Sequence, residues 1–313
     1  IDKDGILKMK EDSKIIKKAR GDFRTLLYKE RSNHFNKLGR IQDFSHVDLS
    51  GIKLNYGIFP NCNFKGANLK GSSLHFCNLK GANLEGANLE GADLLGANLL
   101  GANLRGAMLY KVTAETSKWN NAKLQGANLN NAYLGHGEMI GANLQGAKLR
   151  KANLEEVNLQ YARLQKADLT EAELYYTDFR GANLKEANFE NANLTNAFLQ
   201  KIDLRYTNLK GANLTNAKLR EADLLGVDLW GNNLQGSNLT NAKLRRVNAQ
   251  YADFQDAYLE KANLQGAILY KANLTKAYLA GADLQGANLE RSNLEKADLE
   301  GADLYYANLK GAN

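Results

Sequence analysis

Residues 81–90 read GANLEGANLE, and this five-residue pattern continues through most of the 313-residue chain. If the leucine is taken as the centre of each unit, centres recur every five residues from position 44 to position 309, which gives 54 units without an insertion. Leu or Phe occupies every centre except Ala114, Trp119, Met139 and Ala249. Ala is usual two residues before the centre, and Asn or Asp is usual one residue before it. An internal repeat of this length has to be interpreted before any other feature.

A period of five fits neither regular helix nor straight strand. Five residues advance about 500° around an α-helix, so the leucines would be spread around its axis. On a straight strand an odd period places successive leucines on opposite faces. The pattern works if a short extended piece points Leu and Ala inward and the chain then turns a corner. Gly is frequent two residues after the centre, as at Gly86 and Gly106, and a residue without a Cβ suits such a corner.

Residues 42–313 therefore resemble the pentapeptide-repeat family, whose motif is A-(N/D)-L-x-x. The resemblance implies an all-β solenoid, namely a right-handed quadrilateral β-helix with four pentapeptides per coil and Leu and Ala inside. It also implies a bacterial origin, and cyanobacteria are especially rich in such arrays. With 20 residues per coil the 54 units make about 13 coils, so residues 20 apart, such as Tyr258 and Tyr278, stack on one another.

The exceptional centres predict compensation inside the solenoid. Ala114 precedes Trp119 by one unit and Ala249 precedes Phe254, so a small centre stands beside a large one and keeps the core volume nearly constant. The alternative is that Trp119 turns outward and marks a recognition spot.

Residues 1–41 differ from the repeat and carry a net charge of +6, almost all of the +7 of the chain. They predict a basic amphipathic helix, because apolar residues recur at helical spacing: Ile15, Ile16, Ala19, Phe23, Leu26 and Leu27. The first interpretation is a helical cap that covers the first coil of a 42–313 β-helix domain. The alternatives are a helix for an anionic surface or for a partner.

Residue types that carry chemistry are few and poorly placed for it. The two cysteines, Cys62 and Cys77, both occupy the inward position usual for Ala, which predicts buried free thiols instead of a disulfide. The four histidines are not spaced for a metal ion, and no nucleophile or phosphate-loop motif is present. No apolar run approaches the length of a membrane span. We therefore expect no enzyme activity, no metal, no cofactor, no small-molecule substrate and a cytoplasmic location.

Function must then lie on the outer faces, which we number as sides 1 to 4 after the centres Phe44, Leu49, Leu54 and Phe59. Side 3 alone is distinctly acidic, and its clearest group of residues predicts an acidic/aromatic patch: Tyr133, Glu155, Glu156, Glu173, Tyr175 and Tyr176. The corner between sides 4 and 1 predicts a basic patch: Lys201, Arg205, Lys218, Arg220, Lys243, Arg245 and Arg246. Each group is either a docking area or solvated surface.

These features favour a non-enzymatic scaffold that binds protein partners along a rigid surface. The alternative is a DNA-mimicking inhibitor or protector of a type II topoisomerase such as gyrase, as some pentapeptide-repeat proteins are. Charge argues against it, because a DNA mimic needs a strongly anionic rod and residues 42–313 carry a net charge of +1. Direct nucleic-acid binding is a weaker third possibility, because the repeat holds no recognised nucleic-acid motif.

The sequence stops partway through a pentapeptide at Asn313. We expect either a cut from a longer protein or a homodimer through the C-terminal coil, with Tyr305 and Tyr306 near its rim. The dimer interpretation rests on the unpaired backbone groups that an uncovered coil presents.

Overall fold

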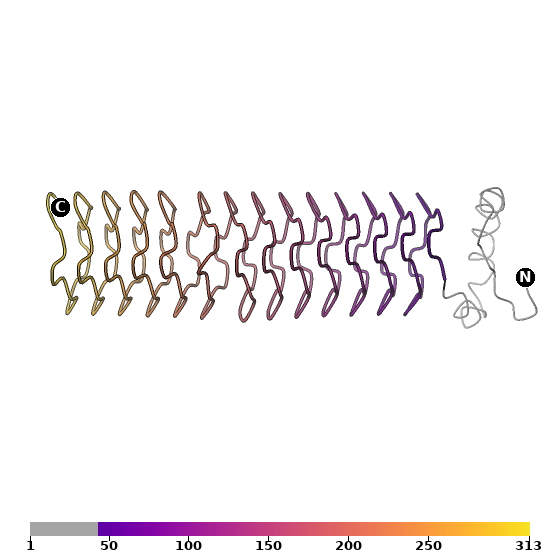
Figure 1. The fold of residues 1–313 in the computed structure, drawn as a ribbon, viewed down its shortest axis with the longest axis horizontal. Helices are drawn as coiled ribbons and strands as arrows, with labels where there is room; N and C mark the ends of the chain where they lie inside the picture. The colour runs from indigo at the N-terminus through magenta and orange to yellow at the C-terminus, as the bar shows by residue number, and fades with distance from the viewer. Residues whose placement is uncertain (1–42) are drawn as a thin grey trace, which may run out of the picture.

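The computed structural model of the chain describes residues 43–313. In this range the chain forms a rod of coils stacked along one axis (Figure 1). Between residues 43 and 313 the chain has no helix and no strand longer than a single bridged residue. The helical cap predicted for residues 1–41 lies outside the described residues.

With two exceptions described below, the residue before the centre pairs with the residue 20 positions later in a parallel bridge from Asp43, which pairs with Asn63, to Asn288, which pairs with Asn308. Backbone hydrogen bonds follow the same register. The N–H of Leu69 donates to the carbonyl of Asn88 at 2.6 Å, and the N–H of Asn88 donates to the carbonyl of Ala67 at 2.9 Å. Each coil is therefore made of four pentapeptides, and the predicted 20-residue register of a β-solenoid is confirmed.

The corners are β-turns that need a left-handed residue. The N–H of Ala67 donates to the carbonyl of Phe64 at 3.0 Å, and Gly66 between them has a φ of 63°. A positive φ at the third residue of a hydrogen-bonded turn is the mark of a type II turn. The same position is left-handed in every unit from His46 to Gly311, yet most of these residues are not glycine. The glycine signal therefore located the corners correctly but understated how many other side chains tolerate them.

Asn or Asp before the centre satisfies a donor that the coil leaves over. Where Asn or Asp precedes the centre, its side-chain oxygen accepts a hydrogen bond from the backbone N–H two residues later. Thus Asn63 Oδ1 accepts from Lys65 N–H at 3.2 Å. The amide groups also join coil to coil, since Asn83 Nδ2 donates to Asn63 Oδ1 at 3.1 Å and Asn103 Nδ2 donates to Asn83 Oδ1 at 3.0 Å. This double use explains the Asn/Asp position of the motif.

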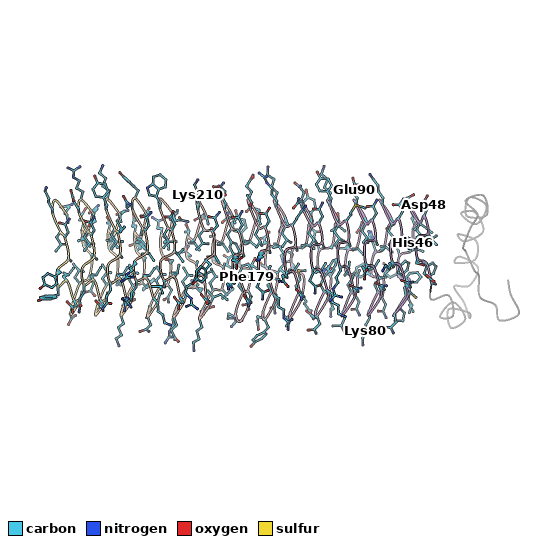
Figure 2. All side chains as sticks on the ribbon, viewed as in Figure 1. His46, Asp48, Lys80, Glu90, Phe179 and Lys210 are labelled. Carbon is cyan, nitrogen blue, oxygen red and sulfur yellow. The ribbon has the colours of Figure 1, made fainter. Side chains whose placement is uncertain are left out.

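The interior is filled by the centres and by the residues two before them. Every centre from Phe44 to Leu289 is buried, and Figure 2 shows Phe179 inside the rod while Lys80 and Lys210 point away from it. Trp119 is 1% exposed beside a fully buried Ala114, so the predicted compensation is confirmed and the outward tryptophan is wrong.

The two cysteines lie in the same interior. Cys62 and Cys77 are buried free thiols, as predicted. Burial raises the pKa of the Cys77 thiol to about 12, although its hydrogen bonding to the backbone acts in the opposite direction. A thiol with so high a pKa stays protonated near neutral pH, which fits a packing role.

The regular stacking of the rod fails in one place. The bridges Asn183 with Asp203 and Asn208 with Asp228 are absent from a series that is otherwise continuous from Asp43 to Asn308. In Figure 1 the pink-to-orange coils lose their even spacing at the corresponding part of the rod. We call this feature the stacking gap and define it as residues 181–186 facing 200–205, together with residues 206–211 facing 225–230.

Candidate interaction surfaces

The titratable groups of the rod do not gather into a metal site. Within residues 43–313 no three His, Cys, Asp or Glu side chains come together as a metal-binding group. The His75 ring contacts the carboxylate of Asp93, and His136 Nδ1 lies 3.1 Å from Glu156 Oε2. The same range contains no helix able to cross a membrane.

The predicted basic patch brings its seven cations onto neighbouring coils, but carboxylates neutralise four of them. Glu221 forms ion pairs with two of these cations, because its oxygens lie 3.5 Å from Lys201 Nζ and 3.4 Å from Arg220 Nε. Arg205 binds Asp203 at 2.7 Å through Nη2 and approaches Asp223 at 3.8 Å through Nε. The hydrogen bond from the Arg205 guanidinium is the main reason why the pKa of Asp203 is lowered.

Asp223 also faces Lys243, with 3.6 Å between Nζ and Oδ2. Three cations of the basic patch remain, namely Lys218, Arg245 and Arg246, and none of them forms an ion pair with another residue in the described part of the chain. The surface is therefore a network of mixed charges with three free cations, not a continuous cationic field.

The acidic/aromatic patch lies on side 3, where parallel bridges join Tyr133 to Asn153 and Asn153 to Glu173. Tyr133 is 52% exposed and Tyr176 is 48% exposed, so both rings are available to a partner. Burial and the neighbouring Glu173 raise the pKa of Tyr175.

A shallow hollow of about 590 Å³ adjoins this patch, and its lining residues are Lys151, Glu171, Glu173 and Asn191. Its charges are already paired to a large extent. Glu171 accepts from Arg150 Nη2 at 2.5 Å and lies 3.1 Å from Lys151 Nζ. The hydrogen bond from Arg150 is the first cause of the lowered pKa of Glu171.

A further surface lies at the corner after side 2. The rings of Trp230 and Tyr251 are 5.8 Å apart, and the rings of Tyr251 and Tyr270 are also 5.8 Å apart. Lys271 Nζ lies 5.6 Å and 5.3 Å from the two tyrosine rings, and Arg291 Nη1 donates to Tyr270 Oη at 3.4 Å. We call these five residues the aromatic ridge. The sequence feature that indicates this surface is the spacing of its aromatic residues, which is close to the 20 residues of one coil.

Comparison with known families covers the whole described rod. The pentapeptide repeat profile matches eight segments, which are 43–86, 77–113, 172–211, 182–221, 212–248, 222–260, 252–291 and 282–313. A second profile, described as a pentapeptide repeat region, matches residues 112–189. No curated protein matches the chain.

Solved structures with detectable similarity include pentapeptide-repeat proteins. QnrB1, a plasmid-mediated fluoroquinolone resistance protein, is 24% identical with a TM-score of 0.44, over 59% of this chain and 92% of its own. HetL, a protein involved in heterocyst differentiation regulation from the cyanobacterium Nostoc sp. strain PCC 7120, is 27% identical with a TM-score of 0.25, over 91% of this chain and 95% of its own. Rfr23 from the cyanobacterium Cyanothece 51142 is 25% identical with a TM-score of 0.15, over 49% of this chain and 93% of its own. The repeat profiles match from residue 43 to residue 313, and this chain therefore belongs to the pentapeptide-repeat family.

Proposed function

We propose that this chain is a non-enzymatic scaffold that binds protein partners on the outside of its rod. The observation that supports this most is the filled interior, in which every centre from Phe44 to Leu289 is buried. Groups able to bind another molecule therefore lie on the outer faces. Extended solenoid surfaces generally serve such binding.

The aromatic ridge and the acidic/aromatic patch suit a protein partner best. Trp, Tyr and Arg are the residues that most often dominate the energy of protein interfaces. Trp230 is 53% exposed and Tyr251 is 47% exposed, so the ridge offers large rings together with two cations. The basic patch suits a supporting role, because a partner's carboxylates would have to compete with Asp203, Glu221 and Asp223 for most of its cations.

We extend the proposal to the finer architecture. Residues 42–313 form about 13 right-handed coils at 20 residues each, and residues 1–41 form the basic helical cap. A cytoplasmic location and a homodimer through the C-terminal coil belong to the same proposal. Light scattering on the full chain tests the dimer.

The scaffold proposal is tested by affinity capture with matched variants of the full chain. The test variant is Trp230→Ala/Tyr251→Ala, and the control is Tyr56→Ala/Phe76→Ala, which removes another exposed ring pair with 5.5 Å between its centroids. We expect a protein captured by the wild type to bind the control equally and the test variant at least about tenfold more weakly. Equal binding by both variants contradicts a role for the ridge, and failure of any protein to bind the wild type contradicts the scaffold.

A further inference from the structure

The stacking gap is a local loss of the bonds that hold the coils together. Four backbone N–H groups on side 1 and its flanking corners have no acceptor in the neighbouring coil, namely those of Gly181, Leu184, Glu186 and Asp203. Four more on side 2 and its flanking corners lack theirs, namely those of Tyr206, Leu209, Gly211 and Asp228. The equivalent groups one coil earlier are bonded, as shown by Leu164 N–H, which donates to the Asn183 carbonyl at 2.8 Å.

Side chains larger than Ala are stacked at the gap. The position two before the centre is usually Ala, and there Ala182 stacks against Ile202 while Thr207 stacks against Val227. Extra methyl groups in a close-packed core push neighbouring coils apart, yet Ile202 on Ala222 and Val227 on Val247 keep their bridges. Overpacking of Ala182 by Ile202 and of Thr207 by Val227 is therefore part of the inference below, and the variants test it. Ala182 is 9% exposed and Thr207 is 8% exposed at positions that are nearly inaccessible elsewhere away from the two ends of the rod, so the coils have parted there.

The remaining bonds show how the chain passes the gap. On side 1 the segment stays joined to the following coil, because Asp203 bridges Asp223. On side 2 it stays joined to the preceding coil, because Asn188 bridges Asn208. The chain thus crosses from one coil to the other near Tyr206, whose side chain is 74% exposed.

Sides 3 and 4 remain closed at the same level of the rod. Asn193 bridges Asn213 on side 3, and Phe198 bridges Lys218 on side 4. A stack of coils that is bonded on two adjoining sides and unbonded on the other two is free to open like a wedge. The bonded sides then act as the pivot.

We infer that the stacking gap is a hinge at which two stiff segments of the rod, residues 43–200 and 211–313, bend relative to each other. The acidic/aromatic patch lies in the first segment and the aromatic ridge in the second, so bending changes the angle between these two surfaces. The hinge rests on the backbone bonds alone and stands whether or not the proposed scaffold function is correct.

Amide hydrogen exchange on the full chain tests the opening of side 1. We expect the Leu184 amide to exchange at least about tenfold faster than the Leu164 amide, which is its bonded equivalent one coil earlier. Ile202→Ala restores the usual residue at this position and should slow exchange at Leu184 toward the rate at Leu164. Exchange at Leu184 that is already as slow as at Leu164 overturns the hinge.

Hydrogen exchange at a second pair of amides, those of Leu209 and Leu229, tests the opening of side 2. Leu209 should exchange at least about tenfold faster than Leu229, whose N–H donates to the Asn248 carbonyl at 2.7 Å, and Val227→Ala should slow exchange at Leu209.

Thermal unfolding distinguishes relief of overpacking by Ile202→Ala from an ordinary core truncation. Ile202→Ala should leave the Tm unchanged or raise it, whereas Val112→Ala, where the ladder is intact, should lower it. A fall in Tm for Ile202→Ala as large as that for Val112→Ala overturns overpacking as the cause.

Bending itself is measured by distances between spin labels in a Cys62→Ala/Cys77→Ala background. The pair Gln145→Cys/Arg245→Cys spans the gap on side 1, five coils or about 24 Å apart. The control pair Lys80→Cys/Arg180→Cys spans five intact coils on side 4 at the same separation. We expect a broader distance distribution for the first pair, and narrowing when Ile202→Ala and Val227→Ala are added. Equal widths for the two pairs overturn the hinge.

Discussion

Trp119 donates its indole Nε1–H to Ser117 Oγ at 2.5 Å, and both side chains are buried. The hydroxyl in turn donates to the carbonyl of Ala114, so one serine links the largest centre of the rod to one of its smallest. A tryptophan fits in this narrow interior because Ala114 leaves it room and Ser117 satisfies its only polar group.

We therefore predict that Ser117→Ala destabilises the rod by about 1–3 kcal/mol, because it leaves the buried indole N–H without an acceptor. The measurement is chemical denaturation followed by circular dichroism. The control is Ser72→Ala, since the buried Ser72 Oγ has no hydrogen-bond partner and Ala is the usual residue at its position. The control should be neutral or stabilising, and an equal loss in both variants would contradict the role given to the Trp119 bond.

The left-handed corners predict a difference between two replacements of one glycine. Gly91 has a φ of 61°, and a Cβ added there meets nothing within 4 Å, so only backbone strain opposes a side chain. Gly91→Val should cost about 1–2 kcal/mol more than Gly91→Asn, because β-branched residues resist the left-handed region and Asn tolerates it. Denaturation of the two variants checks this. Equal stability would mean that the corner relaxes out of its left-handed form.

Much of the fold could be predicted from the sequence because each part of the motif has a definite physical role. Leu at the centre fills the interior, Ala leaves room for the neighbouring coil, and Asn63 and its equivalents satisfy the N–H that the corner leaves over. The 20-residue register was not contained in the five-residue period, which fixes what points inward but not how many sides make a coil. That number came from the family resemblance.

The features that the sequence did not predict depend on contacts between residues in adjacent coils. Lys201 and Glu221 are 20 residues apart, as are Asp223 and Lys243, so counting charges along a side without pairing them overstated the basic patch. The stacking gap also depends on contacts between coils, because Ile202 faces both Ala182 and Ala222 and only the bridge to the first of these coils is lost.

The charge distribution predicts that the chain does not act on gyrase by imitating DNA. Duplex DNA carries one negative charge per roughly 1.7 Å, whereas residues 42–313 are nearly neutral and their carboxylates are extensively paired with Lys and Arg. In a supercoiling assay we expect no inhibition at micromolar protein and no protection from a fluoroquinolone. A positive control with a known gyrase inhibitor sets the sensitivity. Inhibition by this chain would favour the topoisomerase alternative over the scaffold.

Asp178 predicts part of the acid sensitivity of the rod. Burial alone would raise the pKa of this carboxyl, but the Arg180 side chain at 2.6 Å, the Arg180 N–H at 3.0 Å and Gln160 Nε2 at 2.7 Å together lower it. A carboxyl whose pKa is lower in the folded state than in the unfolded state adds stability above the unfolded value, near 3.9. That stability is lost as the pH falls through the lower, folded pKa.

Asp178→Asn should therefore remove a stabilising contribution at neutral pH that is already absent from the wild type in strong acid. Asn keeps the oxygen that accepts the Arg180 N–H and is the usual residue before a centre, so the turn itself is preserved. We expect the difference in unfolding free energy between wild type and variant to be largest near pH 7 and to shrink below about pH 4. Arg180→Ala leaves the Asp178 carboxyl in place but removes the guanidinium that pairs with it. This variant should also reduce the pH-dependent part of the unfolding free energy. Parallel profiles for wild type and Asp178→Asn from pH 7 to pH 2 would show that the Arg180 pairing does not lower the pKa of Asp178.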